Sequence, residues 1–156
     1  MGLDKYHLNL AGEYRVASEL LKRGLFATIT YGHMKGVDIY VVGQRRKATV
    51  VEVKSSTTGR FVTGFYQKYP TRTTEHPDFW VLYWLKDDGS EEFYVLSHVQ
   101  MERAQRKRNR PGATATWEEL ALEFQKGVDN VLAPGLKIHC SKWEKIVKQC
   151  SAPTNR

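Results

Sequence analysis

Apolar residues recur at helical spacing near the start of the chain. The repeating positions are Leu10, Tyr14, Ala17 and Leu21, with Val16 and Leu20 beside them. This periodicity predicts an amphipathic helix over residues 8–23. Gly24 follows the last apolar position and supplies the left-handed residue at which helices commonly end.

Three short segments rich in β-branched and aromatic residues come next, at residues 26–31, 37–42 and 48–53. Glycines and the basic turn 43–47 separate them, which predicts three consecutive strands. Residues 55–77 contain scattered glycine and proline, so a long regular helix is not expected there. We expect this stretch to form a functional loop with room for a short regular element.

The second half of the chain reads as a hairpin followed by helices. Residues 79–85 and 92–96 flank a turn of sequence KDDGS, which predicts two further strands. Capping boxes of the pattern S/T-x-x-E/Q predict three helix starts, at Ser97, Thr116 and Ser141. We therefore expect one α/β domain over residues 1–156. Its core spans about 8–97, with a central mixed sheet and the first helix on one face, and 98–150 form a helical C-terminal extension.

Composition limits the classes of protein that fit this pattern. A chain of 156 residues with 41% hydrophobic content can bury a core without disulfides. No apolar run approaches the roughly 20 residues that span a bilayer, and the polar start does not resemble a signal peptide. The two cysteines form no disulfide framework, so a cytoplasmic protein is expected. The net charge of +7 favours polyanions, although many basic proteins bind no nucleic acid, so charge alone leaves nucleic-acid binding open.

Two of the predicted strands carry acidic side chains where a buried sheet would favour apolar ones. Strand alternation places Asp38 on the face opposite its apolar neighbours, and places Glu52 and Lys54 together on one face. If the two strands pair through the turn 43–47, the Asp38 and Glu52 carboxylates approach one another at the Lys54 end. Adjacent carboxylates repel unless a cation lies between them, and hard oxygen ligands favour Mg²⁺. An isolated Glu-x-Lys usually marks a solvated strand face, so the hypothesis depends on the whole set.

Together with Glu13 on the first helix, the sequences GVD at 36–38 and EVKS at 52–55 resemble the PD-(D/E)XK nuclease superfamily. Its members include restriction endonucleases and archaeal Holliday junction resolvases. The resemblance covers about the first third of the chain and implies a restriction-endonuclease-like αβββαβ core. Two features depart from the family. Val37 replaces the proline of its name, and residues 55–77 do not look helical where members usually carry a helix.

The resemblance implies a metal-dependent DNA endonuclease that hydrolyses phosphodiester bonds. Asp38, Glu52 and the backbone carbonyl of Val53 would hold Mg²⁺, for which Mn²⁺ would substitute. Lys54 would position the attacking water or help to deprotonate it. Glu13 matches an extra acidic residue that many members place on the first helix, where it can reach the metal or its water shell.

Basic and polar residues in two later segments are candidates for nucleic-acid contacts. The first segment follows the proposed site, and the second is a dense positive run. The candidates are Arg60, Gln67, Lys68, Arg72, Arg103, Arg106, Lys107 and Arg108. For the positive run, a solvated helix end is the slightly favoured alternative, and for the first segment, aromatic residues that cover the core are an equal alternative.

Other functions fit the same sequence. A nuclease fold hosts catalytically inactive nucleic-acid-binding modules as readily as enzymes. An interaction subunit of a defence or mobile-element system is a third class. Duplex, junction, flap, single strand and RNA all suit the same catalytic core, and a homodimer would suit a symmetric substrate.

Overall fold

The computed structural model describes residues 2–31, 36–109 and 115–151. Helix α1 (Lys5–Lys22) starts three residues before the predicted helix, because the Asp4 side chain accepts the N–H of His7 at 3.0 Å and caps it. The helix ends before Gly24, which adopts φ of 79° as predicted. Its apolar stripe buries Val16 and Leu20 completely against the sheet.

A five-stranded mixed sheet forms the centre of the molecule, in the order β1-β2-β3-β5-β6. The strands are β1 (Phe26–Ile29), β2 (Ile39–Val42), β3 (Thr49–Ser56), β5 (Phe79–Leu85) and β6 (Glu91–Ser97). Only β3 and β5 run parallel, and the other neighbours are antiparallel. The α/β class, the mixed sheet and all five predicted strands are confirmed. Strand β3 extends to Ser56, beyond the predicted end at residue 53.

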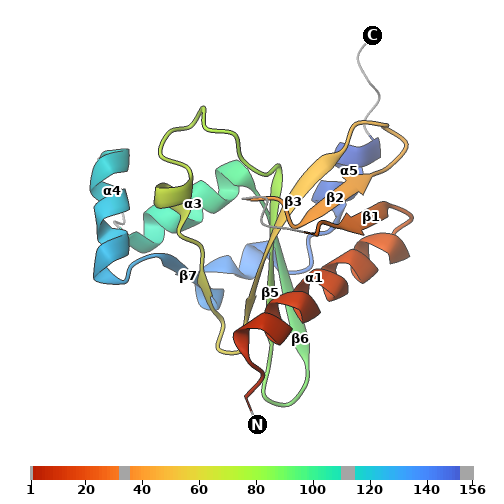
Figure 1. Ribbon diagram of the computed structural model, residues 1–156, viewed down its shortest axis with the longest axis horizontal. Coiled ribbons are helices and arrows are strands. Elements are labelled where there is room, and N and C mark those ends of the chain that lie inside the picture. Colours follow the sequence, from red (N-terminus) through yellow and green to blue (C-terminus); the bar gives the residue numbers. More distant parts are fainter. Residues whose placement is uncertain (1, 32–35, 110–114, 152–156) are drawn as a thin grey trace.

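The sheet is buried on both faces (Figure 1). Helix α1 and the C-terminal helix α5 (Glu144–Ser151) cover one face, where Ile39, Val41 and Val51 are fully buried. The other face carries an aromatic core that includes Trp80 and Phe65. Burial on both sides explains why β5 reads as a continuous apolar run rather than an alternating one.

Residues 55–77 contain two short elements, β4 (Arg60–Val62) and α2 (Phe65–Lys68). Strand β4 pairs with β7 (Asn130–Leu132) in a separate two-stranded sheet. The C-terminal extension was predicted to be helical, but it also contains the strand β7. Two of its helical elements are the 3-10 helices η1 (Phe124–Lys126) and η2 (Ala133–His139). A three-residue strand carries too little periodicity to be recognised before its partner is known.

Two of the three predicted capping boxes are confirmed. Ser97 and Gln100 exchange side-chain to backbone hydrogen bonds of 3.0 and 3.2 Å at the start of α3 (His98–Asn109). Thr116 caps α4 (Trp117–Glu123) in the same way. The box at Ser141 was wrong, because Ser141 adopts φ of 52°, its N–H donates to Phe93, and α5 begins at Glu144. None of the helices in the described ranges is long and apolar enough to cross a membrane.

Gly43 fixes how closely the end of α5 approaches the β2–β3 turn. A Cβ atom at Gly43 would lie 2.8 Å from Cys150 Cβ and 2.9 Å from the Cys150 carbonyl oxygen. That oxygen also accepts the N–H of Arg45 at 3.0 Å. We expect Gly43→Ala to lower the free energy of unfolding by about 1–3 kcal/mol, because the helix must move away from the sheet. Urea denaturation tests this. The control Gly135→Ala, which meets no atom within 4 Å, should change stability little, and equal effects would contradict the prediction.

Candidate active site

The pairing of β2 with β3 brings the two predicted carboxylates together. The ladder ends at the pair of Ile39 with Val51, and Asp38 and Glu52 are the residues that come next to this pair on the two strands. Asp38 precedes β2, and its N–H donates to the Val51 carbonyl at 3.1 Å, which ties it to β3 just outside the regular ladder. In addition, Asp38 Oδ2 accepts the N–H of Val53 at 2.7 Å.

Glu52 is a buried carboxylate held by three donors. Only 1% of the residue is exposed. Its Oε1 lies 3.0 Å from Lys54 Nζ and 2.8 Å from Lys68 Nζ, while Oε2 accepts the Tyr69 hydroxyl at 2.7 Å. Burial favours the neutral acid, but the charges of Lys54 and Lys68 outweigh it and hold the pKa of Glu52 below its usual range. Glu52 is therefore ionised, with both oxygens in use.

The two lysines that contact Glu52 respond differently to this environment. Burial disfavours charge on Lys54, yet the negative charges of Glu52 and Asp38 raise its pKa above the usual value. At Lys68, burial and the positive charge of Lys54 together lower the pKa, against the attraction of Glu52. Lys54 is thus the more firmly charged of the pair.

Glu13 is a titratable carboxyl group beside the same site. It lies on α1, and burial together with the negative charge of Asp38 raises its pKa to about 7, despite the opposing effect of Lys54. Burial also raises the pKa of Asp38, even though the hydrogen bond from Val53 opposes the shift. Two neighbouring carboxyl groups with raised pKa values define a location where added positive charge is favourable.

The raised pKa of Glu13 predicts a pH-dependent stability. The folded protein retains the proton that the unfolded chain loses near pH 4.5, so this contribution declines as pH rises from about 4.5 to 7. With chelator present, we expect the wild type to lose about 1–2 kcal/mol relative to Glu13→Gln between pH 5 and 8, after discounting for solvent screening. Urea titrations of both proteins at several pH values measure the difference. Parallel curves would show that Glu13 does not titrate in this range.

An open cleft of about 680 Å³ gives access to the site from solvent. Glu13, Asp38, Val53 and Lys54 all line it, whereas Glu52 lies below the lining. Three of the predicted nucleic-acid contacts line the cleft as well, namely Arg60, Gln67 and Lys68. Three of the four side chains predicted to perform chemistry therefore line one opening, and the fourth, Glu52, is buried in contact with Lys54.

The other predicted nucleic-acid contacts do not line this cleft. Arg72 lies 3.7 Å from Glu102 and above the Trp117 ring. Arg106 donates to the Ala115 carbonyl at 2.7 Å and Arg108 to Asn130 Oδ1 at 3.2 Å, so both guanidinium groups have partners within the protein. The remaining two, Arg103 and Lys107, are exposed on α3.

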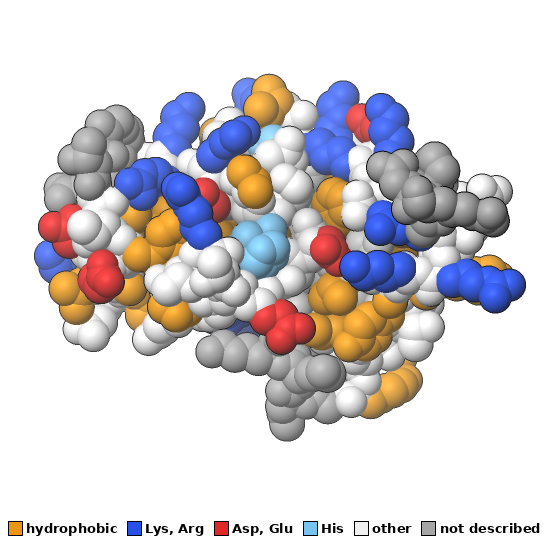
Figure 2. All heavy atoms as spheres, turned by 90° about the horizontal axis from the view of Figure 1, so that it is seen from above, with side chains coloured by type: hydrophobic (Ala, Val, Ile, Leu, Met, Phe, Trp, Pro, Cys, Tyr) orange, Lys and Arg blue, Asp and Glu red, His pale blue; other side chains and the backbone are white. Residues whose placement is uncertain are grey.

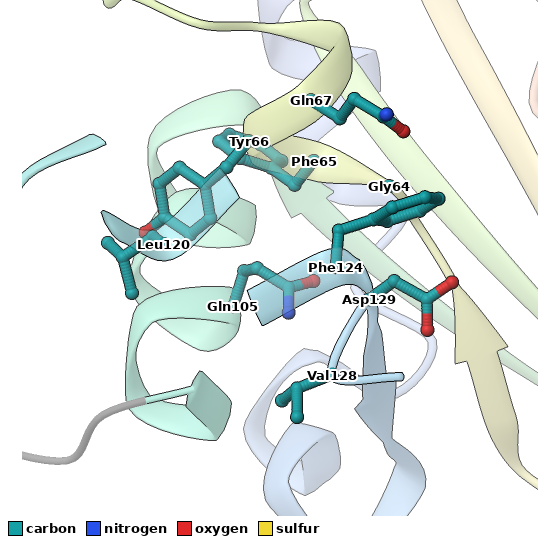
Figure 3. Close-up of a pocket in the computed structure, with 9 residues that line it drawn as sticks. All are labelled: Gly64, Phe65, Tyr66, Gln67, Gln105, Leu120, Phe124, Val128 and Asp129. Atoms are coloured by element: carbon teal, nitrogen blue, oxygen red, sulfur yellow. The ribbon is translucent and has the colours of Figure 1, made fainter. Parts of the chain in front are cut away.

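The segment that delivers Lys68 and Tyr69 is anchored from below. Figure 3 shows Gln105 of α3 and Asp129 beneath α2. The Asp129 carbonyl accepts the N–H groups of Thr63 and Gly64 at 2.8 and 3.1 Å. The pocket at this place measures only about 10 Å³, room for one water at most, so it is a packing seam and not a ligand site. Sequence reasoning did not include Tyr69 among the site residues, although it ends a segment, FYQKY, in which aromatic residues flank the predicted contacts Gln67 and Lys68.

The donor set suits a hard divalent cation. Asp38 and Glu13 carry raised carboxyl pKa values, and Glu52 already attracts two ammonium groups. Within the described ranges, no three His, Cys, Asp or Glu side chains gather closely enough to hold a metal by themselves. A metal here would need the Val53 carbonyl and water as further ligands. It would also have to displace an ammonium group from Glu52.

Comparison with known proteins gives no relative. No family model matches the chain, and the curated proteins and solved structures that were searched contain no significant match. The functional argument therefore depends on the residues of this site.

Proposed function

We propose that this protein is a metal-dependent DNA endonuclease of the PD-(D/E)XK type. The observation that carries the proposal is that Glu52 contacts Lys54 at 3.0 Å and Asp38 binds the neighbouring Val53 N–H at 2.7 Å, beside a solvent-accessible cleft that Asp38 and Lys54 line. Placing neighbouring acidic side chains and a lysine in a sheet that is otherwise buried on both faces lowers the stability of the folded protein. A catalytic role gives a reason for that cost.

The order of elements supports the same proposal. Helix α1 precedes three antiparallel strands, and β3 then pairs in parallel with β5 after a crossover. This order fits the αβββαβ core of the superfamily. The departure expected from the sequence remains, since the crossover contains only the four-residue helix α2 where members usually carry a longer one.

The site divides the work among its residues. When bound by Asp38, Glu52 and the Val53 carbonyl, Mg²⁺ or Mn²⁺ would neutralise phosphate charge and acidify a water molecule. Lys54 supplies a fixed positive charge for the additional negative charge of the transition state. Glu13 exchanges its proton near neutral pH and can accept one from the attacking water. As the water oxygen bonds to phosphorus, the phosphorus–ester oxygen bond breaks and the leaving oxygen takes up a proton.

Charge supports a nucleic acid as the substrate. The chain has 24 Lys and Arg residues against 17 Asp and Glu. Lys and Arg side chains are spread over much of the face in Figure 2, with acidic side chains scattered between them. Arg60 and Lys68 bring positive charge into the cleft itself. Such a distribution favours a phosphate backbone and predicts strong salt dependence.

A cleavage panel tests the proposal. Supercoiled plasmid, linear duplex, four-way junction, flap, single-stranded DNA and RNA are incubated with Mg²⁺, with Mn²⁺, or with chelator. We expect metal-dependent cleavage of at least one DNA substrate, and the substrate that is cut identifies the structural preference. Absence of cleavage across the panel would overturn the proposal, as would cleavage that survives in chelator.

One observation favours a second candidate, an inactive nucleic-acid-binding module. Lys54, Lys68 and Tyr69 together satisfy Glu52 without any metal, so the site is internally compensated. For a binding module, DNA affinity measured by fluorescence anisotropy should be unaffected by Mg²⁺ and no substrate should be cut. For an endonuclease, Mg²⁺ should alter the affinity and enable cleavage.

A further inference from the structure

Two ammonium groups share one oxygen of Glu52. Lys54 Nζ and Lys68 Nζ lie 3.0 and 2.8 Å from Oε1. Lys54 comes from the same strand two residues further on, so strand alternation alone brings it to this face. Lys68 comes from α2, sixteen residues away, and its side chain is still 26% exposed to the cleft. Its presence at Glu52 is therefore a property of the tertiary structure.

The position of Lys68 is built into the fold. The N–H of Lys68 donates to Gly64 O at 3.0 Å, and the Trp117 indole N–H donates to the carbonyl of Tyr69. Tyr69 in turn donates its hydroxyl to Glu52 Oε2 at 2.7 Å. The backbone on both sides of Lys68 is thus fixed, while its four-carbon side chain retains a path into the cleft.

We propose that Lys68 binds Glu52 in the metal-free protein and that a divalent metal ion displaces Lys68 from this carboxylate. The released ammonium group of Lys68 then contacts a non-bridging oxygen of the scissile phosphate. The inference rests on the proposed nuclease function and gives it a second catalytic lysine. Glu52 Oε1 already accepts two ammonium groups, so a metal ion that binds this oxygen takes the place of one of them, and Lys68 is the one that belongs to a separate element, α2. Lys54 belongs to the same strand as Glu52 and keeps its contact with this carboxylate.

Charge balance supports this exchange. Asp38, Glu52 and Glu13, when ionised, carry three negative charges against the two positive charges of Lys54 and Lys68. A divalent ion and one phosphodiester group add a net charge of +1 and make the assembled site neutral. Lys68 therefore compensates Glu52 before the metal arrives and the phosphate afterwards.

A purely structural role for Lys68 predicts something different. If Lys68 only anchored α2 to the sheet, its removal would loosen the site and weaken metal binding. If Lys68 competes with the metal, its removal strengthens metal binding while it slows cleavage. Metal affinity without DNA therefore separates the two roles.

The experiment measures Mn²⁺ binding by electron paramagnetic resonance in the absence of DNA, and single-turnover cleavage at saturating Mn²⁺. For Lys68→Met we expect Mn²⁺ affinity to rise about tenfold, because a positive charge next to the metal is removed. Its cleavage rate should fall about 10- to 100-fold. Lys68→Arg, which keeps the charge, should retain the affinity of the wild type and part of its rate. The matched control Lys148→Met removes an exposed lysine of α5 and should change neither quantity.

Unchanged or weaker Mn²⁺ binding by a folded Lys68→Met protein would overturn the inference while the nuclease assignment stood. Failure of both wild type and Lys68→Met to bind Mn²⁺ would overturn the inference and the proposed function together. Spectra of ¹³Cε-labelled lysine in the wild type test the same displacement without any variant. Addition of Mg²⁺ should shift the Lys68 resonance as it leaves Glu52, and an unmoved resonance in a metal-loaded protein would refute the exchange.

Discussion

Glu52→Gln is expected to reduce the cleavage rate by at least about 1000-fold at saturating Mg²⁺. Glu52 is the most buried carboxylate of the site, and its charge attracts Lys54 and Lys68 at 3.0 and 2.8 Å. The substitution preserves side-chain volume but removes the charge that would hold the metal. Mn²⁺ binding should weaken in parallel, which links the loss of rate to the loss of a ligand.

The control for this prediction is Glu92→Gln. Glu92 also forms an ion pair with a lysine, Lys86, and accepts the hydroxyl hydrogen of a tyrosine, Tyr94, but neither partner lines the cleft, whereas the Glu52 partners Lys54 and Lys68 do. The Glu92→Gln protein should cleave DNA at the rate of the wild type. Urea denaturation of both variants is needed, because two lysines lose their counter-charge when Glu52 is neutralised. Retention of metal-dependent cleavage by a folded Glu52→Gln protein would remove Glu52 from the catalytic set.

Lys54→Met is expected to lower kcat about 100-fold and to change KM much less. The negative charges of Glu52 and Asp38 keep the pKa of Lys54 above its usual value, against the effect of burial. The ammonium group is therefore charged at neutral pH, and in the proposed reaction it would act on the transition state as a fixed charge and not as a base. The methionine side chain occupies a similar volume, so the loss should come from the charge.

Lys54→Arg should recover only part of this rate, because a planar guanidinium group does not reproduce a compact ammonium charge. Lys22→Met serves as the control, since Lys22 pairs with Glu19 on the exposed side of α1. Single-turnover and steady-state assays with the preferred DNA substrate give kcat and KM. A Lys54→Met protein as active as Lys22→Met would mean that the Glu-x-Lys pattern has no catalytic meaning here.

The proposals for Lys54 and Lys68 require opposite behaviour of these two side chains at the Glu52 carboxylate. Lys54 is required to stay near Glu52, and Lys68 is required to leave it. The opposite directions of their pKa shifts agree with this division, since Lys54 is stabilised in its charged form more strongly than Lys68. Because both lysines contact the same oxygen of Glu52, the losses in cleavage rate are not expected to add, and a double variant measures the coupling between them.

The central sheet follows from the pattern of the sequence. Strand periodicity, turn residues and capping boxes located all five strands of the sheet and the starts of α3 and α4. The pattern failed where an element is too short to show a period, as at β7, or where a local motif lost to a tertiary contact. At Ser141, the hydrogen bond of the backbone N–H to Phe93 replaced the expected cap.

The sequence by itself determined that Asp38 lies close to Glu52 and Lys54. Alternation along two strands and the short turn between them suffice to bring these side chains to one face, because the contacts are local. The arrival of Lys68 and Tyr69 at Glu52 was decided by the tertiary structure. Their segment is positioned by Trp117 and by Asp129, which lies beside β7, from parts of the chain about 50 to 65 residues away. No local pattern encodes a contact that exists only after these distant elements have packed together.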